Sequence, residues 1–161
     1  LRTIPERAKG QLVFAVIHEN VDFRALGLAH ATSLRVRLDK KSGLVESYLT
    51  EDEDYVMHST TDSEKGKLAK TEYTVVFETS YYSVVKINLL TGKKNQIRVH
   101  MADLGHPIVG DAKYGKDKNS KHKNLMLHAF AISFEHPFSK KLIRVQAEVP
   151  DYFHKVVEYK Y

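Results

Sequence analysis

The stretch TEYTVVFETSYYSVVKINLL, Thr71–Leu90, decides the fold class of this chain. It is rich in Val, Thr and Tyr, the residue types that favour β-strands, and its composition changes near Ser80. The pattern predicts two sheet strands, Thr71–Thr79 and Tyr81–Leu90, separated by a turn. Strands joined by a short turn pair antiparallel, so the stretch predicts an antiparallel sheet.

Other segments of strand character lie on both sides of this stretch. Gln11–Ile17 is a continuous apolar run suited to a buried strand, although its length alone does not exclude a helix. Apolar residues alternate in Asn124–Pro137 and again in Lys140–Pro150, where the proline ends the pattern. Gly43–Leu49 and Asp54–Thr60 are short strand-like segments around an acidic loop.

Three helical segments are predicted. Val21–Ala31 has apolar residues at intervals of three and four. Gln96–Leu104 also has apolar residues at helical spacing, and Gly105 then stops the pattern. Asp151 is a suitable cap for a final helix. The fold class predicted is α+β, with a mixed, largely antiparallel sheet and few short helices.

The length and composition bound the kind of protein. A chain of 161 residues fits one domain, so residues 1–161 are predicted to form a single domain. It contains no cysteine, which excludes a disulfide framework, a thiolate metal site and a catalytic thiol. It has no apolar run of about 18 residues and does not start with a secretory signal, so we expect a cytoplasmic protein without a membrane partner. The first residue is Leu, which indicates a piece of a longer protein.

Charge is distributed unevenly along the chain. Seven acidic residues and no Lys or Arg lie between Glu46 and Glu64. Eight basic and three acidic residues lie between Thr91 and Asn124, a surplus equal to the net charge of +5 for the whole chain. Such a local positive field favours a polyanionic partner carrying phosphates, while a solvated lysine loop is the alternative.

The predicted helix Gln96–Leu104 has a distinctive start. Ile97 and Met101 would face the core, while Lys94 and Arg98, four residues apart, would share another face. Cations at the start of a helix oppose its dipole, and a bound anion would remove the conflict. Lys93, Lys94 and Arg98, together with the backbone N–H groups, are therefore candidates to hold phosphates or a buried carboxylate.

At this point the sequence resembles a known family. Thr91–Gly115, TGKKNQIRVHMADLGHPIVGDAKYG, is similar to the TGRxHQIRVH and LGHPIxGDxxYG signature of the RluA-like family of pseudouridine synthases. Lys93 replaces the usual Arg and Asn95 the usual His. Gly66–Tyr73 resembles the family's GKxAxTxY segment, and Leu125–Pro137 resembles its LHAxxLxFxHP strand.

The resemblance covers Leu44–Pro150, so the chain looks like a fragment or truncated form of the catalytic domain. It implies an RNA-modifying enzyme that isomerises uridine to pseudouridine in ribosomal or transfer RNA, without a cofactor or a metal. Arg98 would be the cation that pairs with the catalytic Asp. The alternative for Arg98 is an ion pair that only orients the helix. The residues assigned to RNA binding are Lys93, Lys94, Asn95, Lys113 and Tyr114, of which the tyrosine would stack on a base.

The family's nucleophile lies in an HRLDxxTSG motif, and two alignments to it stay open. Arg37–Gly43, RLDKKSG, makes Asp39 the nucleophile, but one residue is missing before the Ser-Gly pair. Arg2–Ala15, RTIPERAKGQLVFA, fits the strand and the spacing to Arg98 better, but it places Pro5 where the family has Asp. The second alignment is favoured, and it predicts a chain that lacks the nucleophile.

The expected stacking tyrosine after the first helix is also missing. Three hypotheses therefore remain: an active pseudouridine synthase, a catalytically silent RNA-binding relative, and a domain whose lysines only solubilise its surface. His100 and His106 are interpreted as structural rather than metal-binding, because no third ligand recurs at a useful spacing. Asp111 is expected to fix the turn in which it lies.

Overall fold

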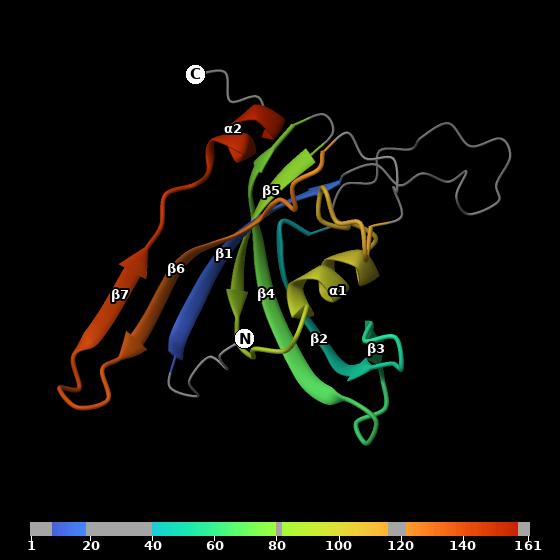
Figure 1. Cartoon of the computed structure of the whole chain (residues 1–161), viewed down its shortest axis with the longest axis horizontal. Coiled ribbons are helices and arrows are strands. Elements are labelled where there is room, and N and C mark those ends of the chain that lie inside the picture. The colour runs from blue at the N-terminus through green and yellow to red at the C-terminus, as the bar shows by residue number, and fades with distance from the viewer. Residues whose placement is uncertain (1–7, 19–39, 80–81, 116–121, 158–161) are drawn as a thin grey trace, which may run out of the picture.

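The computed structural model describes residues 8–18, 40–79, 82–115 and 122–157, which form one seven-stranded sheet and two helices (Figure 1). The strands are β1 (Ala8–His18), β2 (Ser42–Glu51), β3 (Met57–Thr60), β4 (Lys67–Glu78), β5 (Tyr82–Leu89), β6 (Leu127–Glu135) and β7 (Leu142–Gln146). The helices are α1 (Gln96–Asp103) and α2 (Asp151–Val157).

The order of strands across the sheet is β3-β2-β4-β5-β1-β6-β7, and all pairings among these strands are antiparallel. β1 comes first in the chain but lies between β5 and β6. Its Val13 is opposite Ile87 on one side and Ala129 on the other. The predicted α+β class with a largely antiparallel sheet is confirmed.

β4 shows how the sequence sets the two faces of the sheet. Ala69, Thr71 and Tyr73 are buried, whereas Glu72 and Thr74 between and beyond them are exposed. Successive side chains of a strand point to opposite faces, so the alternation assigns one face to the interior. Figure 1 shows α1 lying across this part of the sheet, over β2 and β4.

α1 supplies the centre of the core. Ile97 is 7% exposed and Met101 is fully buried, and both pack with Val85 and Ile87 of β5. Leu104, the C-cap residue, is partly buried against the same cluster. The helix and its apolar face are therefore as the spacing of apolar residues predicts.

The chain after α1 turns twice through glycine. Gly105 has φ +81° and its N–H donates to the carbonyl of Ala102, which ends the helix. Gly110 has φ +77°, and a Cβ atom there would lie 2.0 Å from the carbonyl oxygen of Asn124. Only glycine fits both the angle and the space, and this close turn directs Asp111 back toward α1.

A second, smaller core cluster lies between α1 and the β2–β3 hairpin. It contains Leu49, Met57, Ala69 and Val99, and Tyr114 packs against it. Strands β2 and β3 pair from Tyr48–Thr60 to Glu51–Met57, and Glu51 forms an ion pair with Lys94, so the hairpin turn lies beside the start of α1. Residues far apart in the sequence thus meet at this end of the sheet.

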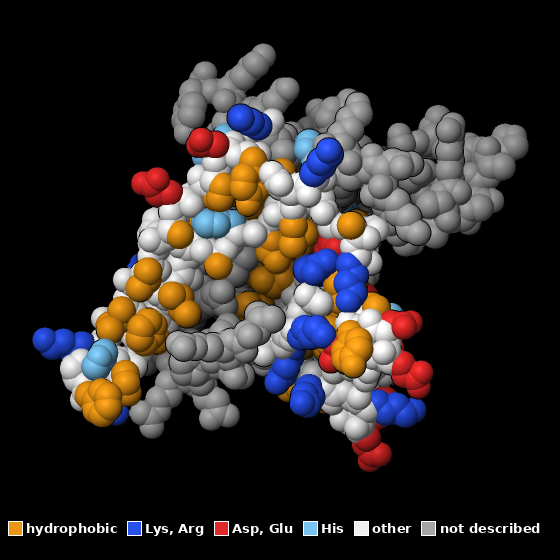
Figure 2. Space-filling model, viewed as in Figure 1, with side chains coloured by type: hydrophobic (Ala, Val, Ile, Leu, Met, Phe, Trp, Pro, Cys, Tyr) orange, Lys and Arg blue, Asp and Glu red, His pale blue; other side chains and the backbone are white. Residues whose placement is uncertain are grey.

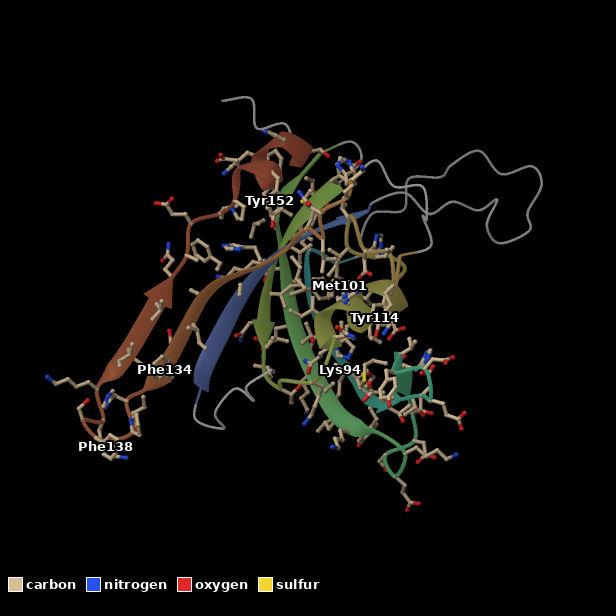
Figure 3. The ribbon with its side chains drawn as sticks, in the orientation of Figure 1. Lys94, Met101, Tyr114, Phe134, Phe138 and Tyr152 are labelled. Atoms are coloured by element: carbon tan, nitrogen blue, oxygen red, sulfur yellow. The ribbon has the colours of Figure 1, made fainter. Side chains whose placement is uncertain are left out.

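At the opposite end of the sheet, β7 is an edge strand that exposes Leu142 and Val145. Phe138, in the turn before it, is 89% exposed and lies far from Tyr114 and Lys94 (Figure 3). The predicted final helix is present as α2, with Asp151 as its first residue rather than its cap, and its Phe153 is buried in the main core.

The structure shortens two predicted strands, of which Lys140–Pro150 forms a strand only over Leu142–Gln146. Asp54–Thr60 forms a strand only over Met57–Thr60, because the residues before it belong to a turn held by the Asp52 carboxylate. The predicted helix Val21–Ala31 and the Ser80 turn lie outside the described residues. In the part of the chain that is described, no helix is long and apolar enough to cross a membrane.

Candidate functional site

The start of α1 is fixed to the sheet by the buried side chain of Gln96. Its Oε1 accepts hydrogen bonds from the Thr91 hydroxyl at 2.8 Å and from the Lys93 N–H at 3.1 Å. Its Nε2 donates to the carbonyl of Lys70 and to the hydroxyl of Thr71, both at 2.9 Å. A buried amide with all these partners holds one orientation, so it sets the position of the helix on β4.

His100, one turn further along α1, makes a second polar link to the sheet. Its Nδ1 lies 2.8 Å from the Thr71 hydroxyl and its Nε2 3.0 Å from the Ser47 hydroxyl. Burial lowers the pKa of His100, and the negative charge of Asp103 opposes this only in part. The imidazole is therefore neutral near pH 7 and bridges β2, β4 and α1. Among the described residues, no group of three or more His, Cys, Asp or Glu side chains could hold a metal ion.

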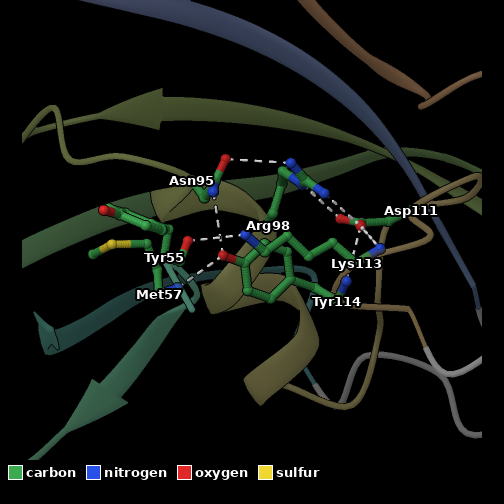
Figure 4. Close-up of polar contacts among 7 residues, drawn as sticks. All are labelled: Tyr55, Met57, Asn95, Arg98, Asp111, Lys113 and Tyr114. Carbon is green, nitrogen blue, oxygen red and sulfur yellow. Dashed lines mark hydrogen bonds and ion pairs between the residues drawn. The ribbon is translucent and has the colours of Figure 1, made fainter. Parts of the chain in front are cut away.

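Arg98 points away from the core toward the turn that follows Gly110, as Figure 4 shows. Its Nε donates to Asp111 Oδ2 at 2.8 Å, and its Nη2 donates to Asp111 Oδ1 at 2.7 Å. The Arg98 side chain is 21% exposed and that of Asp111 is fully buried. Such a two-point ion pair fixes both the position and the plane of the guanidinium.

Asp111 also fixes its own turn, as expected. Its Oδ1 accepts the backbone N–H of Lys113 at 3.0 Å and that of Tyr114 at 2.9 Å. Burial alone would raise the pKa of Asp111, but the bonds from Arg98 and from these two N–H groups outweigh it and hold the pKa below its usual value. The hydrogen bonds that Arg98 donates to Asp111 raise the pKa of Arg98. Both groups are thus charged, as the two-point pairing requires.

Two further side chains restrain the guanidinium. Asn95 accepts a hydrogen bond from Arg98 Nη1 at 3.2 Å, and the Tyr114 ring lies below the guanidinium with 4.9 Å between Arg98 Cζ and the ring centroid. The Tyr114 hydroxyl accepts from Asn95 Nδ2 at 3.2 Å and from the Met57 N–H at 3.1 Å. Asn95 has φ +54°, a left-handed conformation that asparagine tolerates well.

The lysines predicted to bind RNA lie around this cluster and contact the turn of the β2–β3 hairpin. Lys94 forms an ion pair with Glu51, and its Nζ lies 5.6 Å from the centroid of the Tyr55 ring. Lys113 donates from Nζ to the carbonyl of Tyr55 at 2.9 Å. The space-filling view shows basic side chains gathered over this region, with acidic ones along its outer edge (Figure 2).

The structure thus brings together most of the residues predicted from the sequence. Arg98, Asn95 and Tyr114 form one connected group. Lys94 and Lys113 lie beside this group, and both contact the turn of the β2–β3 hairpin. Lys93 is half-buried, and the contacts described for it are those of its backbone with Gln96. The two positions considered for the nucleophile, Asp39 and Pro5, lie outside the described residues.

Sequence reasoning missed Gln96 and Tyr55. Gln96 lies inside the QIRVH motif, which is a signal for its importance, but its partners Lys70 and Thr71 come from a strand about 25 residues away. Tyr55 lies in the acidic loop, and its contact with Lys113 joins residues 58 positions apart. Both contacts join segments that are far apart in the sequence, so they become visible only in the folded structure.

The sequence pattern of the family described as RNA pseudouridylate synthase matches residues 26–103, a range that includes Asp39 and excludes Pro5. The chain is 36% identical over 94 residues to ribosomal large subunit pseudouridine synthase D of Zymomonas mobilis, covering 53% of this chain and 30% of that protein. It is 32% identical over 133 residues to tRNA pseudouridine synthase C of Vibrio vulnificus, covering 78% of this chain and 53% of that protein.

The fold is also similar to that of a solved structure. Human RNA Pseudouridylate Synthase Domain Containing 1 has a similar structure, with a TM-score of 0.67 over 96% of this chain and 67% of that one, at 18% sequence identity. The chain spans about a third to a half of the length of the two bacterial relatives above. The signature around Arg98 and the sequence matches agree: the chain is similar to RNA pseudouridine synthases of the RluA-like family.

Proposed function

We propose that this protein is an RNA pseudouridine synthase, which isomerises uridine to pseudouridine in ribosomal or transfer RNA. The observation that carries the proposal is the fixed guanidinium of Arg98, held by Asp111, Asn95 and Tyr114 within the family's QIRVH motif. Three of its five N–H groups make these bonds, so among the described contacts two remain for another acceptor.

The reaction needs an ionised carboxylate in a closed site. The bond between C1′ of the ribose and N1 of uracil breaks, a bond between C1′ and C5 forms, a proton leaves C5 and N1 gains one. No oxidant or reductant is required. The target base has to leave the RNA stack to reach such a site, at a cost of a few kcal/mol. The role proposed for Arg98 is to keep the reacting carboxylate ionised with its two remaining N–H groups.

Asp111 does not suit the role of that carboxylate. Its Oδ1 accepts three hydrogen bonds, its Oδ2 accepts one, and its side chain is fully buried. A carboxylate stabilised in this way, with a lowered pKa, is a poor nucleophile and a poor base. Asp111 is therefore proposed as the anchor of Arg98, and the nucleophile as a second carboxylate, for which Asp39 is the candidate within the family match.

The RNA-binding residues proposed are Lys93, Lys94, Asn95, Lys113 and Tyr114. They lie in the segment Thr91–Asn124, whose positive surplus equals that of the whole chain, and lysines in such a segment are suited to contact phosphates. The relatives' names refer to large-subunit ribosomal RNA and to transfer RNA, which is the basis for proposing these two classes of substrate. A cytoplasmic location is part of the same proposal.

The test is release of tritium from RNA labelled at C5 of uridine, because the C5 hydrogen leaves only when the new bond forms there. The full chain is incubated with ribosomal and transfer RNA transcripts. Arg98→Lys keeps the charge but removes the two-point pairing, so we expect turnover to fall at least 100-fold. Arg144→Lys, at an exposed position of β7, is the matched control and should keep full activity.

Asp39→Asn tests the nucleophile in the same assay, and we expect it to release no tritium. If Asp39→Asn is as active as the wild type, Asp39 is not the nucleophile. If the wild-type chain binds RNA but releases no tritium at enzyme-stoichiometric levels, the enzymatic function is refuted and the chain is a silent RNA-binding relative.

A further inference from the structure

The turn of the β2–β3 hairpin places one aromatic side chain in an unusual position. Tyr55 has φ +58° and a relative exposure of 71%. A left-handed conformation is unfavourable for a residue with a bulky side chain, whereas glycine or asparagine adopts it readily. Neither backbone preference nor burial of the ring accounts for a tyrosine here.

The surrounding residues hold this conformation firmly. The Asp52 carboxylate accepts the N–H of Asp54 at 3.0 Å and that of Val56 at 2.8 Å, and the N–H of Tyr55 donates to the Asp52 carbonyl at 3.1 Å. Asp52 is itself paired with His58 at 2.6 Å. The turn is therefore built to present the Tyr55 ring to solvent in one place.

That place is beside the Arg98 cluster. Lys113 donates to the carbonyl of Tyr55 at 2.9 Å, and the Nζ of Lys94 lies 5.6 Å from the centroid of its ring (Figure 4 shows the Tyr55–Lys113 contact). An exposed aromatic ring between two lysines combines a stacking surface for a base with cations for the neighbouring phosphates.

The hairpin turn also carries acidic residues, two of which are paired. Glu51 is paired with Lys94 and Asp52 with His58, so both carboxylates are engaged. Glu53 and Asp54 are exposed in the same turn. The carboxylates of Glu53 and Asp54 would repel phosphates. They would therefore direct an RNA backbone toward the side of the Tyr55 ring where the lysines lie.

We propose that Tyr55 is a base-stacking residue for single-stranded RNA, binding a nucleotide next to the one that enters the Arg98 site, with Lys94 and Lys113 contacting its phosphates. This inference rests on the RNA-binding part of the proposed function. It does not require that the chain be catalytically active. The observation behind it is an exposed tyrosine in an unfavourable backbone conformation with two lysines beside it.

A fluorescent substitution tests the stacking directly, because the chain contains no tryptophan. Tyr55→Trp introduces the sole tryptophan, and a single-stranded oligouridylate should quench its fluorescence in a saturable way. Phe138→Trp, at an 89% exposed position in the turn before β7, is the matched control and should be quenched little. Equal quenching at the two positions, or none at Tyr55→Trp while the oligouridylate binds, would overturn the inference.

A second pair of variants separates stacking from a structural role. Tyr55→Phe keeps the ring and should bind the oligouridylate as the wild type does. Tyr55→Gly removes the ring and suits φ +58°, so it should fold at least as stably while its affinity falls about 5- to 150-fold. If Tyr55→Gly binds the oligouridylate as tightly as the wild type, Tyr55 is not a stacking residue.

The outcomes also separate this inference from the proposed enzymatic function. Quenching at Tyr55→Trp in a chain that releases no tritium supports the stacking role and refutes the enzyme. Tritium release by the wild type together with unaltered affinity of Tyr55→Gly refutes only the stacking role. A wild-type chain that binds no oligouridylate in a filter-binding assay refutes this inference and the RNA-binding proposal together.

Discussion

Asp111 binds Arg98 through two hydrogen bonds, from Nε to Oδ2 at 2.8 Å and from Nη2 to Oδ1 at 2.7 Å. The same carboxylate accepts the N–H groups of Lys113 and Tyr114, so one side chain fixes both the cation and the turn beside it. This arrangement explains how a semi-exposed arginine keeps one orientation. It also means that Arg98 is already positioned before any substrate arrives.

Replacing Asp111 by Asn should destabilise the protein and abolish its activity. The variant keeps the shape of the side chain but loses the charge that opposes Arg98. Hydrogen bonds to charged groups are worth about 1.5–3 kcal/mol, so we expect a loss of about 2–3 kcal/mol in the free energy of unfolding, measured by urea denaturation. Glu46→Gln, which breaks the exposed pair with Lys70, should cost less than about 1 kcal/mol. Equal losses for the two variants would contradict the anchoring role of Asp111.

The buried His100 should make stability depend on pH below neutrality. Its pKa is lowered in the folded protein from an ordinary value of 6.5, so the unfolded chain takes up the proton first as the pH falls. Stability is therefore undiminished above pH 6.5 and declines as the pH falls below it. Denaturant titrations at a series of pH values measure this slope. His100→Gln should flatten the slope between pH 6.5 and its folded pKa, whereas His154→Gln on the exposed face of α2 should not.

The Asp111 carboxylate contributes a second pH dependence at lower pH. Its folded pKa lies below the ordinary value of 3.8, so its stabilisation is complete above that value and is lost as the pH falls through the folded pKa. In Asp111→Asn the remaining stability should lose this acid-sensitive component. An unchanged acid transition in the variant would show that other carboxylates account for it.

Neutralising the lysines beside Tyr55 should reduce the salt dependence of RNA binding. A phosphate contact on a single strand contributes about 0.7 to the slope of log affinity against log salt. Lys94→Gln and Lys113→Gln should each lower the slope by about that amount, as measured by filter binding with an oligouridylate. Lys141→Gln, exposed before β7, should leave it unchanged. A slope that none of the three variants alters would exclude Lys94 and Lys113 as phosphate contacts.

Two glycines with the same backbone conformation should respond differently to alanine. Gly105 has φ +81° and open space around it, so Gly105→Ala should cost only the roughly 1–2 kcal/mol of the left-handed conformation. Gly110 has φ +77° and its Cβ would lie 2.0 Å from the Asn124 carbonyl, so Gly110→Ala should cost clearly more and also displace Asp111. Thermal unfolding compares the two. Similar losses of stability in the two variants would mean that the turn after Gly110 can move to accommodate the Cβ atom without a further loss of stability.

The secondary structure was largely predictable because it depends on local patterns. The Val, Thr and Tyr content of Thr71–Leu90 predicted β4 and β5, and apolar residues at helical spacing predicted α1 and its buried face. The predicted strand at Asp54–Thr60 was too long, because a side chain, Asp52, rather than an apolar pattern holds the turn before β3. Patterning does not report such a local hydrogen bond.

The sequence predicted which residues belong to the candidate site but not the contacts among them. The family signature identified Arg98 and RNA as the substrate, and charge along the chain indicated a polyanionic partner carrying phosphates. Neither could show that Gln96 joins α1 to Thr71 or that Lys113 holds the Tyr55 turn. These contacts join residues on different strands and loops, so they follow from the strand order and not from spacing along the chain.

By itself, the sequence determined the strands, the helix that carries Arg98, the placement of charge and the resemblance to the family. Only the tertiary structure decided that Asp111 is the partner of Arg98, and that an acidic hairpin turn lies against the lysines of the basic segment. The physical reason is that local preferences act over a few residues, whereas ion pairs between distant segments form only after the sheet has brought those segments together.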